Sequence, residues 1–304
     1  MKVFINRKYV DGPWGGGNQF VKNLFKYGKK FGVDITNTLS DDIDVIHIQD
    51  VHPDELGVDW KHAVSYKQYI NPDVKIVHRV NDMDLGRYGS APWRVGVYRE
   101  FSKDCDATIF VSDWTKEFFL NEGWYCNNLF TIINGVDTEI FKPREKINNG
   151  KINIVTHHWS NNKGKGFDIY NKIDRFVKDN PDFTFTYIGQ HQGTFRNTKC
   201  ISPIFGKELG KELSKYDVYV SASEYENCPN HILESLACGI PTYALSGYRG
   251  AASVNLVGND FVYESWGDLK NILLSKKFSD NYDYKVTDWE ECMRLYFKVY
   301  KGVV

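Results

Sequence analysis

The sequence lacks a long apolar run, paired cysteines and an excess of charge of either sign. No run of about eighteen apolar residues occurs, so no transmembrane helix is predicted, and Met1 to Asn6 is typical of a first strand rather than a signal peptide. The six cysteines are scattered without a C-x-x-C pair, which indicates neither a zinc site nor a disulfide framework. We therefore expect a cytoplasmic protein with reduced thiols, and peripheral attachment to a membrane stays open.

The balance of charge argues against two classes of partner. The chain has 38 lysines and arginines and 39 aspartates and glutamates, for a net charge of -1. This balance gives no basic field for nucleic acid and no polybasic patch for a membrane surface. We expect no nucleic-acid partner and no integral membrane segment.

The length predicts two domains. A chain of 304 residues is enough for two cores of about 150 residues each. The turn signal Asn134-Gly135 precedes a charged, asparagine- and glycine-rich stretch from Arg144 to Gly150. We predict an N-terminal domain over residues 1–146, a second domain over 147–285 and a C-terminal aromatic helix within 286–304.

The segment from residue 217 to residue 247 has the most informative pattern. Asp217 to Ala222 alternates in the period of a strand, and a helix follows in which Pro229 suits the first position. Gly239 marks the end of that helix, and the apolar run from Pro241 to Leu245 predicts a second strand. Together they form the strand-helix-strand unit of a parallel sheet.

Two glutamates lie at the start of this helix, where ligands of open α/β sheets bind. Glu226 falls in the loop and Glu234 in the helix, away from its apolar stripe. Carboxylates can accept both hydroxyls of a sugar diol, and the helix start favours a phosphate between them. The alternative interpretation is that both acids are solvated surface residues.

Two glycine loops are further candidates for phosphate contact. Gly15 to Gly17 follows the first strand, and glycines let the backbone approach a ligand closely. It is no dinucleotide fingerprint, because Phe20 stands where G-x-G-x-x-G requires its third glycine. Lys163 to Gly166 follows the strand that begins at Ile152 and offers cations for a diphosphate, unless its two lysines are only solvated.

Two more predicted strands, residues 44–49 and 74–80, are each followed by polar side chains: Asp50 and His52 after the first, and Asn81, Asp82 and Asp84 after the second. We expect these strand ends to face a ligand cleft. His47, His52 and His78 could be read as metal ligands or as ordinary strand and loop residues. Their separations match no closed zinc site, which favours the second interpretation.

The segment E-N-C-P-N-H-I-L-E-S-L-A-C-G-I-P, residues 226–241, resembles the E-x7-E signature of retaining nucleotide-sugar glycosyltransferases of family four. Further segments resemble that family in order and spacing: Gly15–Gly17, Asp106–Ser112, Ile133–Asp137, Phe141–Pro143 and Lys165–Asp168. The resemblance covers most of the chain. It implies the GT-B fold, in which two Rossmann-like doubly wound α/β domains face each other across a cleft and the last helix crosses back to the first domain.

The resemblance also implies roles for individual residues. The catalytic positions it marks are Lys165, Glu226, Asn81 and Asp82. In the family, the lysine binds the diphosphate, the first glutamate the donor sugar and the second glutamate the ribose. Glycines 16 and 17 approach the diphosphate or sugar, and positions 189 and 202–205 lie near the base. The donor-binding positions are Gly16, Gly17, Lys163, His158, Gly189, Pro203, Phe205, Asn227, Cys228, Asn230 and Glu234.

Three departures from the family pattern bear on these roles. Asn81 stands where the family has a histidine, so the sugar contact falls to Asn81 or Arg79. Ser160 stands where the family has an arginine, for which Lys163, His157 or His158 are substitutes. Pro229 removes one backbone N–H from the sugar-binding loop, so the sugar hydroxyl bound there can differ from the one that the family binds.

The resemblance implies a retaining transfer of a hexose-type sugar from a UDP-, GDP- or dTDP-sugar to a hydroxyl of a glycan, lipid-linked or small-molecule acceptor. No cofactor, metal ion or protein nucleophile is expected. Two alternatives remain: a nucleotide-sugar epimerase of the same fold, and a sugar-nucleotide-binding protein without catalysis.

Overall fold

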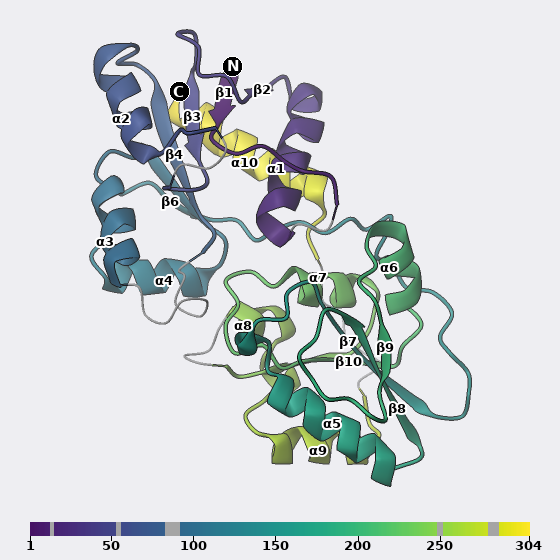
Figure 1. Ribbon diagram of the computed structural model, residues 1–304. Coiled ribbons are helices and arrows are strands. Elements are labelled where there is room, and N and C mark those ends of the chain that lie inside the picture. Colours follow the sequence, from purple (N-terminus) through teal and green to yellow (C-terminus); the bar gives the residue numbers. More distant parts are fainter. Residues whose placement is uncertain (13–14, 53–55, 83–91, 248–251, 279–285) are drawn as a thin grey trace. The chain divides into compact units, whose positions relative to one another are not determined.

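The computed structural model describes residues 1–12, 15–52, 56–82, 92–247, 252–278 and 286–304 (Figure 1). By their contacts these residues divide into two compact units. The first unit comprises Met1–Gly135 together with Thr287–Val304, and the second comprises Val136–Val286.

The described part of the first unit contains a six-stranded, parallel sheet in the order β2-β1-β3-β4-β5-β6. Its strands are β1 (Lys2–Ile5), β2 (Asp34–Thr36), β3 (Val45–Ile48), β4 (Lys75–Val80), β5 (Ala107–Phe110) and β6 (Leu129–Thr131). Its helices are α1 (Gly15–Gly28), η1 (Lys29–Phe31), α2 (Trp60–Tyr69), α3 (Pro92–Phe101), α4 (Asp113–Asn121) and α10 (Trp289–Val303). The strand order reverses between β1 and β3, and such a switch point is where open α/β sheets bind ligands.

Both faces of the first sheet are covered, as an all-parallel sheet requires. On one face, Phe20 and Leu24 of α1 pack in one apolar cluster with Met293 and Tyr296 of α10. In Figure 1 the yellow α10 lies beside the purple α1. Aromatic and branched side chains of α2, α3 and α4 fill the other face. The last helix therefore completes the core of the first unit, as the fold implied by the sequence requires.

The described part of the second unit has a parallel sheet of the same kind, in the order β12-β11-β10-β7-β8-β9. Its strands are β7 (Ile152–His158), β8 (Phe183–Gly189), β9 (Lys199–Ile201), β10 (Val218–Ser221), β11 (Thr242–Leu245) and β12 (Val262–Tyr263). Its helices are η2 (Lys163–Lys165), α5 (Phe167–Asp179), α6 (Gly206–Leu213), α7 (Asn230–Ala237), α8 (Ala252–Val257), η3 (Asn259–Phe261) and α9 (Trp266–Ser275). The switch point of this sheet lies between β7 and β10.

Some local expectations needed correction. The sequence from Cys200 to Phe205 also predicts a strand, but β9 ends at Ile201, because Pro203 has no N–H to continue the ladder. Pro229 is the residue before α7 rather than its first helical residue. Asp84 lies outside the described residues, as does most of the segment from Leu85 to Trp93, for which the glycine, serine and proline residues predict a loop.

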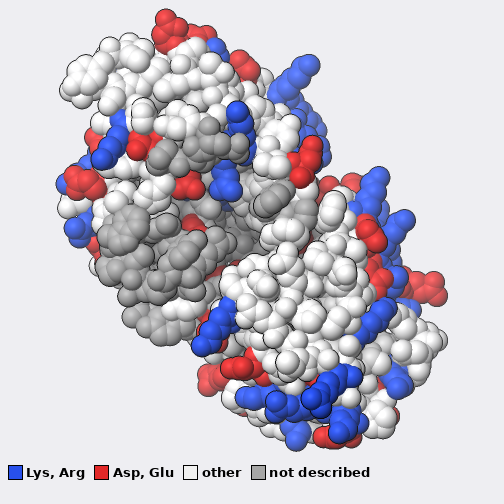
Figure 2. All heavy atoms as spheres, viewed as in Figure 1, with Lys and Arg blue, Asp and Glu red and all other residues white. Residues whose placement is uncertain are grey.

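Surface and cysteine features follow the composition. Figure 2 shows lysine and arginine side chains interspersed with acidic ones on the visible face, as expected for a net charge of -1. Within the described ranges, no helix is long and apolar enough to cross a membrane. All six cysteines are free thiols, and Cys126, Cys238 and Cys292 are buried.

Candidate functional site

The candidate site of the second unit lies at the carboxyl ends of β7 and β10, on either side of the switch point. Gly166 brings the loop after β7 against the end of β10. Its φ of +76° and the space around it both require glycine, since an added Cβ would lie 2.0 Å from the carbonyl oxygen of Ala222. A backbone bond from Glu224 N–H to the Gly164 oxygen, 2.9 Å, joins the same two segments. The two loops singled out by the sequence therefore meet.

Lys165 and Glu226 form an ion pair where these loops meet. The Lys165 Nζ atom lies 2.6 Å from Glu226 Oε1, and both side chains are mostly buried, with exposed fractions of 15% and 13%. Sixty-one positions in the sequence separate them. The structure thus joins the predicted phosphate-binding lysine directly to the predicted sugar-binding glutamate.

Glu234 has a basic partner of its own. It lies in α7, and its Oε2 accepts a hydrogen bond of 2.8 Å from Nε2 of His157 at the end of β7. The other ring nitrogen of His157, Nδ1, is buried without a partner. Because an unpaired lone pair costs less than an unpaired buried N–H, the proton belongs on Nε2. The Glu234 side chain keeps an exposed fraction of 24%, so the carboxylate is held by His157 and still reaches solvent.

A buried polar network lies beneath these acids. Tyr170 accepts a hydrogen bond from the Ala222 N–H, 2.9 Å, and its hydroxyl donates to Nε2 of His158 at 2.6 Å. Nε2 of His231 lies 2.9 Å from the Ser221 hydroxyl, and the His158 and His231 rings are 4.7 Å apart. Burial lowers the pKa of both histidines well below the usual value, so both are neutral at pH 7. His158, predicted as donor-binding, thus lies behind the site surface with its ring occupied by Tyr170.

The remaining predicted residues of the second unit are distributed differently. Asn227, Cys228 and Asn230 are half-buried in the segment that joins β10 to α7. Gly189 has a φ of +124° and packs so closely on β7 that a Cβ would lie 2.0 Å from the His158 oxygen. Pro203, Phe205 and Lys163 are exposed. None of these three has a described contact with the Lys165–Glu226 pair.

In the first unit the glycine loop meets the end of β4. The predicted glycine loop forms the first turn of α1, and a Cβ added to Gly17 in that turn would lie 3.7 Å from Nδ2 of Asn81. Gly16 is the adjacent residue of the same turn. Asp82 is half-buried. Arg79, the alternative to Asn81 for the sugar contact, is instead a core residue, because its guanidinium donates to the Tyr296 hydroxyl and to Asn134 Oδ1.

The histidines of the first unit are packing residues. His47 stacks on Phe20, and its Nδ1 lies 2.8 Å from the Tyr300 hydroxyl oxygen. His78 stacks between aromatic rings, including that of Tyr98. Among the residues that the structure describes, no three histidine, cysteine or acidic side chains are grouped as metal ligands would be.

Sequence reasoning missed the network residues Tyr170 and His231, as well as the pairing of His157 with Glu234. Tyr170 occupies an apolar position of an amphipathic helix, and His231 interrupts the apolar stripe of α7. The one signal in the sequence is a histidine at a buried helical position, which indicates a hydrogen-bonded polar side chain behind the loop.

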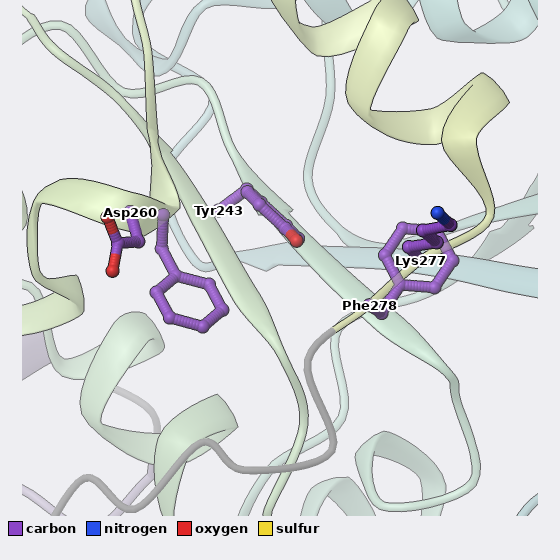
Figure 3. A pocket seen from close by; sticks show the side chains of 5 residues that line it. Tyr243, Asp260, Lys277 and Phe278 are labelled. Carbon is purple, nitrogen blue, oxygen red and sulfur yellow. The ribbon is translucent and has the colours of Figure 1, made fainter.

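A cavity of about 350 Å³ lies elsewhere in the second unit (Figure 3). The Tyr243, Phe261 and Phe278 rings line it together with Asp260 and Lys277. In Figure 3 the Asp260 carboxylate and the Lys277 ammonium lie on opposite sides of the Tyr243 ring. None of the predicted site residues lines this cavity.

Comparison with known families and structures agrees with the resemblance found in the sequence. The family model described as Glycosyltransferase Family 4 matches residues 16–140. This match confirms the resemblance over that part of the chain and, with it, the expectation of a glycosyltransferase. No curated protein matches the chain by sequence.

Several solved structures share the fold. HepE of Anabaena, solved in complex with UDP and glucose, has a TM-score of 0.70 at 13% identity, covering 99% of each chain. Sucrose-phosphate synthase of Thermosynechococcus elongatus has a TM-score of 0.66 at 14% identity, covering 94% of this chain and 77% of its own. WaaG, a glycosyltransferase involved in lipopolysaccharide biosynthesis, has a TM-score of 0.60 at 11% identity, covering all of both chains. The predicted GT-B fold, with two Rossmann-like domains, is confirmed.

Proposed function

We propose that the protein transfers a hexose-type sugar from a nucleoside-diphosphate sugar to an acceptor hydroxyl, with retention of configuration and without a metal ion. The observation that carries the proposal is the Lys165–Glu226 pair at the switch point of the second sheet, 2.6 Å apart. The pair places a cation that can bind a phosphate next to a carboxylate that can accept hydrogen bonds from sugar hydroxyls. Glu234 lies in the helix that follows the same loop, where we assign it to the ribose.

The proposed reaction breaks the bond between the anomeric carbon and the leaving phosphate oxygen. Lys165 stabilises the negative charge that develops on the diphosphate, with help from the positive end of the helix dipole at the start of α7. The acceptor hydroxyl oxygen forms the new bond on the same face of the sugar, and its proton goes to the leaving phosphate oxygen. Glu226 holds the sugar hydroxyls during the transfer.

A nucleotide preference can be proposed from the solved relatives. HepE has been solved with UDP and with UDP-glucose. We therefore propose UDP-glucose as the first donor to examine, with GDP- and dTDP-sugars as comparisons. The acceptor is proposed to be the hydroxyl of a glycan, of a lipid-linked saccharide or of a small molecule.

The experiment that tests the proposal is calorimetric titration with each nucleotide sugar, followed by mass spectrometry of the products in EDTA with a panel of acceptors. Transfer in EDTA supports the proposal, and the anomeric configuration of the product, read by NMR, tests retention. An isomeric sugar nucleotide formed without acceptor would identify an epimerase. Binding without turnover would indicate a non-catalytic sugar-nucleotide-binding protein.

Replacing Glu234 with alanine is expected to weaken UDP binding by about 1.5–3 kcal/mol, the range for hydrogen bonds to a charged group. The measurement is the dissociation constant from calorimetry. Glu224→Gln is the matched control, because Glu224 is an exposed acid of the same loop. Unchanged affinity in Glu234→Ala would remove this residue from the site.

His157→Phe is expected to weaken UDP binding by about 1 kcal/mol, since the ring stays but the donor to Glu234 Oε2 is lost. The loss should disappear in the Glu234→Ala background, because His157 acts by orienting that carboxylate. A double-mutant cycle on UDP affinity measures this coupling. Additive losses would show that His157 does not act through Glu234.

A further inference from the structure

The cavity of about 350 Å³ in the second unit is lined mainly by aromatic rings (Figure 3). Tyr243 belongs to β11, Phe261 is the last residue of η3, and Phe278 lies beyond the end of α9. The centroids of the Phe261 and Phe278 rings lie 5.3 and 6.3 Å from that of the Tyr243 ring. The volume falls at the small end of the range for ligand sites, about 300–1,000 Å³. The cavity therefore offers a small ligand an aromatic surface.

Three polar groups border the same cavity and are available to a ligand. The Tyr243 side chain is 5% exposed, yet within the described ranges its hydroxyl has no hydrogen-bond partner. Asp260 and Lys277 are exposed, and over the same residues neither forms an ion pair or a side-chain hydrogen bond. Since buried polar groups are almost always paired, the Tyr243 hydroxyl is suited to a partner inside the cavity.

The backbone holds the lining residues in place on both sides of the cavity. Lys276, at the end of α9, has a φ of +51° and is the one non-glycine residue with a positive φ in the described part of the chain. Its Nζ atom pairs with Asp182 at 2.6 Å, and the next two residues line the cavity. Gly258, with a φ of +81°, precedes η3, which supplies two further lining residues. Side chains positioned in advance lose less entropy when a ligand binds.

The chemistry of this lining fits a saccharide better than an amino acid or an apolar molecule. A pyranose has a face of C–H groups that packs on aromatic rings, and its hydroxyls both donate and accept hydrogen bonds. Asp260 can accept such bonds and Lys277 can donate them. In Figure 3 these two groups lie on opposite sides of the Tyr243 ring. The hydroxyls around a sugar ring can reach both, whereas the ammonium and carboxylate of an amino acid share one carbon. An apolar ligand would use neither.

We propose that this cavity binds one hexose-type unit of a saccharide, at a site distinct from the Lys165–Glu226 pair. The choice of a sugar rests in part on the proposed function, in which the acceptor can be a glycan, whereas the lining itself is independent of that function. A glycan held by one of its units stays tethered to the protein, which raises the effective concentration of its other hydroxyls.

The test uses NMR of the full chain with ¹³C-labelled tyrosine rings. Of the 19 tyrosines, the one whose signal is missing in Tyr243→Phe is Tyr243, and this signal reports binding in the cavity. The probes are the methyl glycosides of glucose, galactose, mannose and N-acetylglucosamine, with phenylalanine and cyclohexanol as rivals. At least one glycoside is expected to shift the signal in a saturable manner. If Tyr243→Phe fails to fold, saturation transfer from the protein to each glycoside, measured on the variants below, replaces this readout.

Surface variants show whether the polar groups of the cavity hold the sugar. Asp260→Ala and Lys277→Ala are each expected to weaken the bound glycoside by about fivefold or more, because each removes a charge-assisted hydrogen bond. Glu264→Ala and Lys270→Ala remove the same kinds of charge from exposed positions of the same unit and should stay within twofold. Glu226→Gln should also leave this affinity within twofold, because the proposed cavity site does not use that residue.

The proposal is overturned if no glycoside binds, if only phenylalanine or cyclohexanol shifts the Tyr243 signal, or if Asp260→Ala and Lys277→Ala leave every affinity within twofold. Failure of the proposed function looks different. In that case sugar nucleotides neither bind nor react, while a glycoside still binds in a manner that depends on Asp260 and Lys277.

Discussion

Replacing Lys165 with alanine is expected to lower the turnover of a sugar donor by about two to three orders of magnitude, the range for removing one group that stabilises transition-state charge. The Lys165 side chain is mostly buried next to Glu226, so water replaces its charge poorly. Binding of the donor should fall less than turnover, because the negative charge on the leaving diphosphate grows during the reaction. Steady-state kinetics with saturating donor separates the two effects.

Two variants make the Lys165 prediction specific. Lys172→Ala, an exposed lysine of α5, controls for loss of a positive charge and should keep wild-type turnover. In Lys165→Ala the Glu226 carboxylate loses its partner, so part of the damage comes from that unpaired charge. A double-mutant cycle that combines Lys165→Ala with Glu226→Gln measures how much of the loss of turnover comes from the unpaired carboxylate. A change in KM alone would contradict a transition-state role for Lys165.

Lowering the pH from 7.5 to 5.5 is expected to reduce the free energy of unfolding by about 5 kcal/mol. In the described part of the chain, burial lowers the pKa of four histidines below the ordinary value: His78, to about 3, and His47, His158 and His231. The unfolded chain takes up protons below about pH 6.5 and the folded chain does not. Each of these histidines therefore lowers the free energy of unfolding by about 1.4 kcal/mol per pH unit once the pH falls below about 6.5.

Denaturant unfolding at a series of pH values measures this effect. The stability contribution is complete above about pH 6.5 and is lost as the pH falls. His78→Phe should remove about a quarter of the dependence and keep the fold, because neither ring nitrogen of His78 has a hydrogen-bond partner and its neighbours are aromatic. The exposed His191, changed to Asn, should leave the slope unaltered. A flat profile between pH 7.5 and pH 5.5 would refute the argument.

The strands, the doubly wound architecture and the two loops of the second unit could be predicted because they depend on local pattern. Alternation before Ser223, the apolar stripe of α7 and the glycines around Lys165 each leave a signal within a few residues. An α-helix turns by about 100° per residue, which places Glu234 away from the apolar stripe of α7. Its half-buried position follows from that place. Where such a signal was short, as before Pro203, the predicted boundary was wrong.

The partners of the site residues could not be predicted, because they depend on strand order. His157 and His158 are neighbours in β7, so their side chains point to opposite faces, and only the sheet decides which of them meets Glu234. Gln49, which follows β3, belongs to no motif. Its side-chain amide donates to the Gly17 oxygen at 3.2 Å because β1 and β3 are adjacent in the first sheet, a fact that no local pattern contains.

The pairing of Lys165 with Glu226 has a consequence for selectivity. In the free protein each side chain neutralises the other at 2.6 Å, so the lysine offers little net attraction to an ion that carries charge alone. A ligand with both an anionic group and a set of hydroxyls can replace both halves of the pair at once. The cellular pool of orthophosphate should consequently compete poorly at this lysine, even where it far outnumbers the sugar nucleotide.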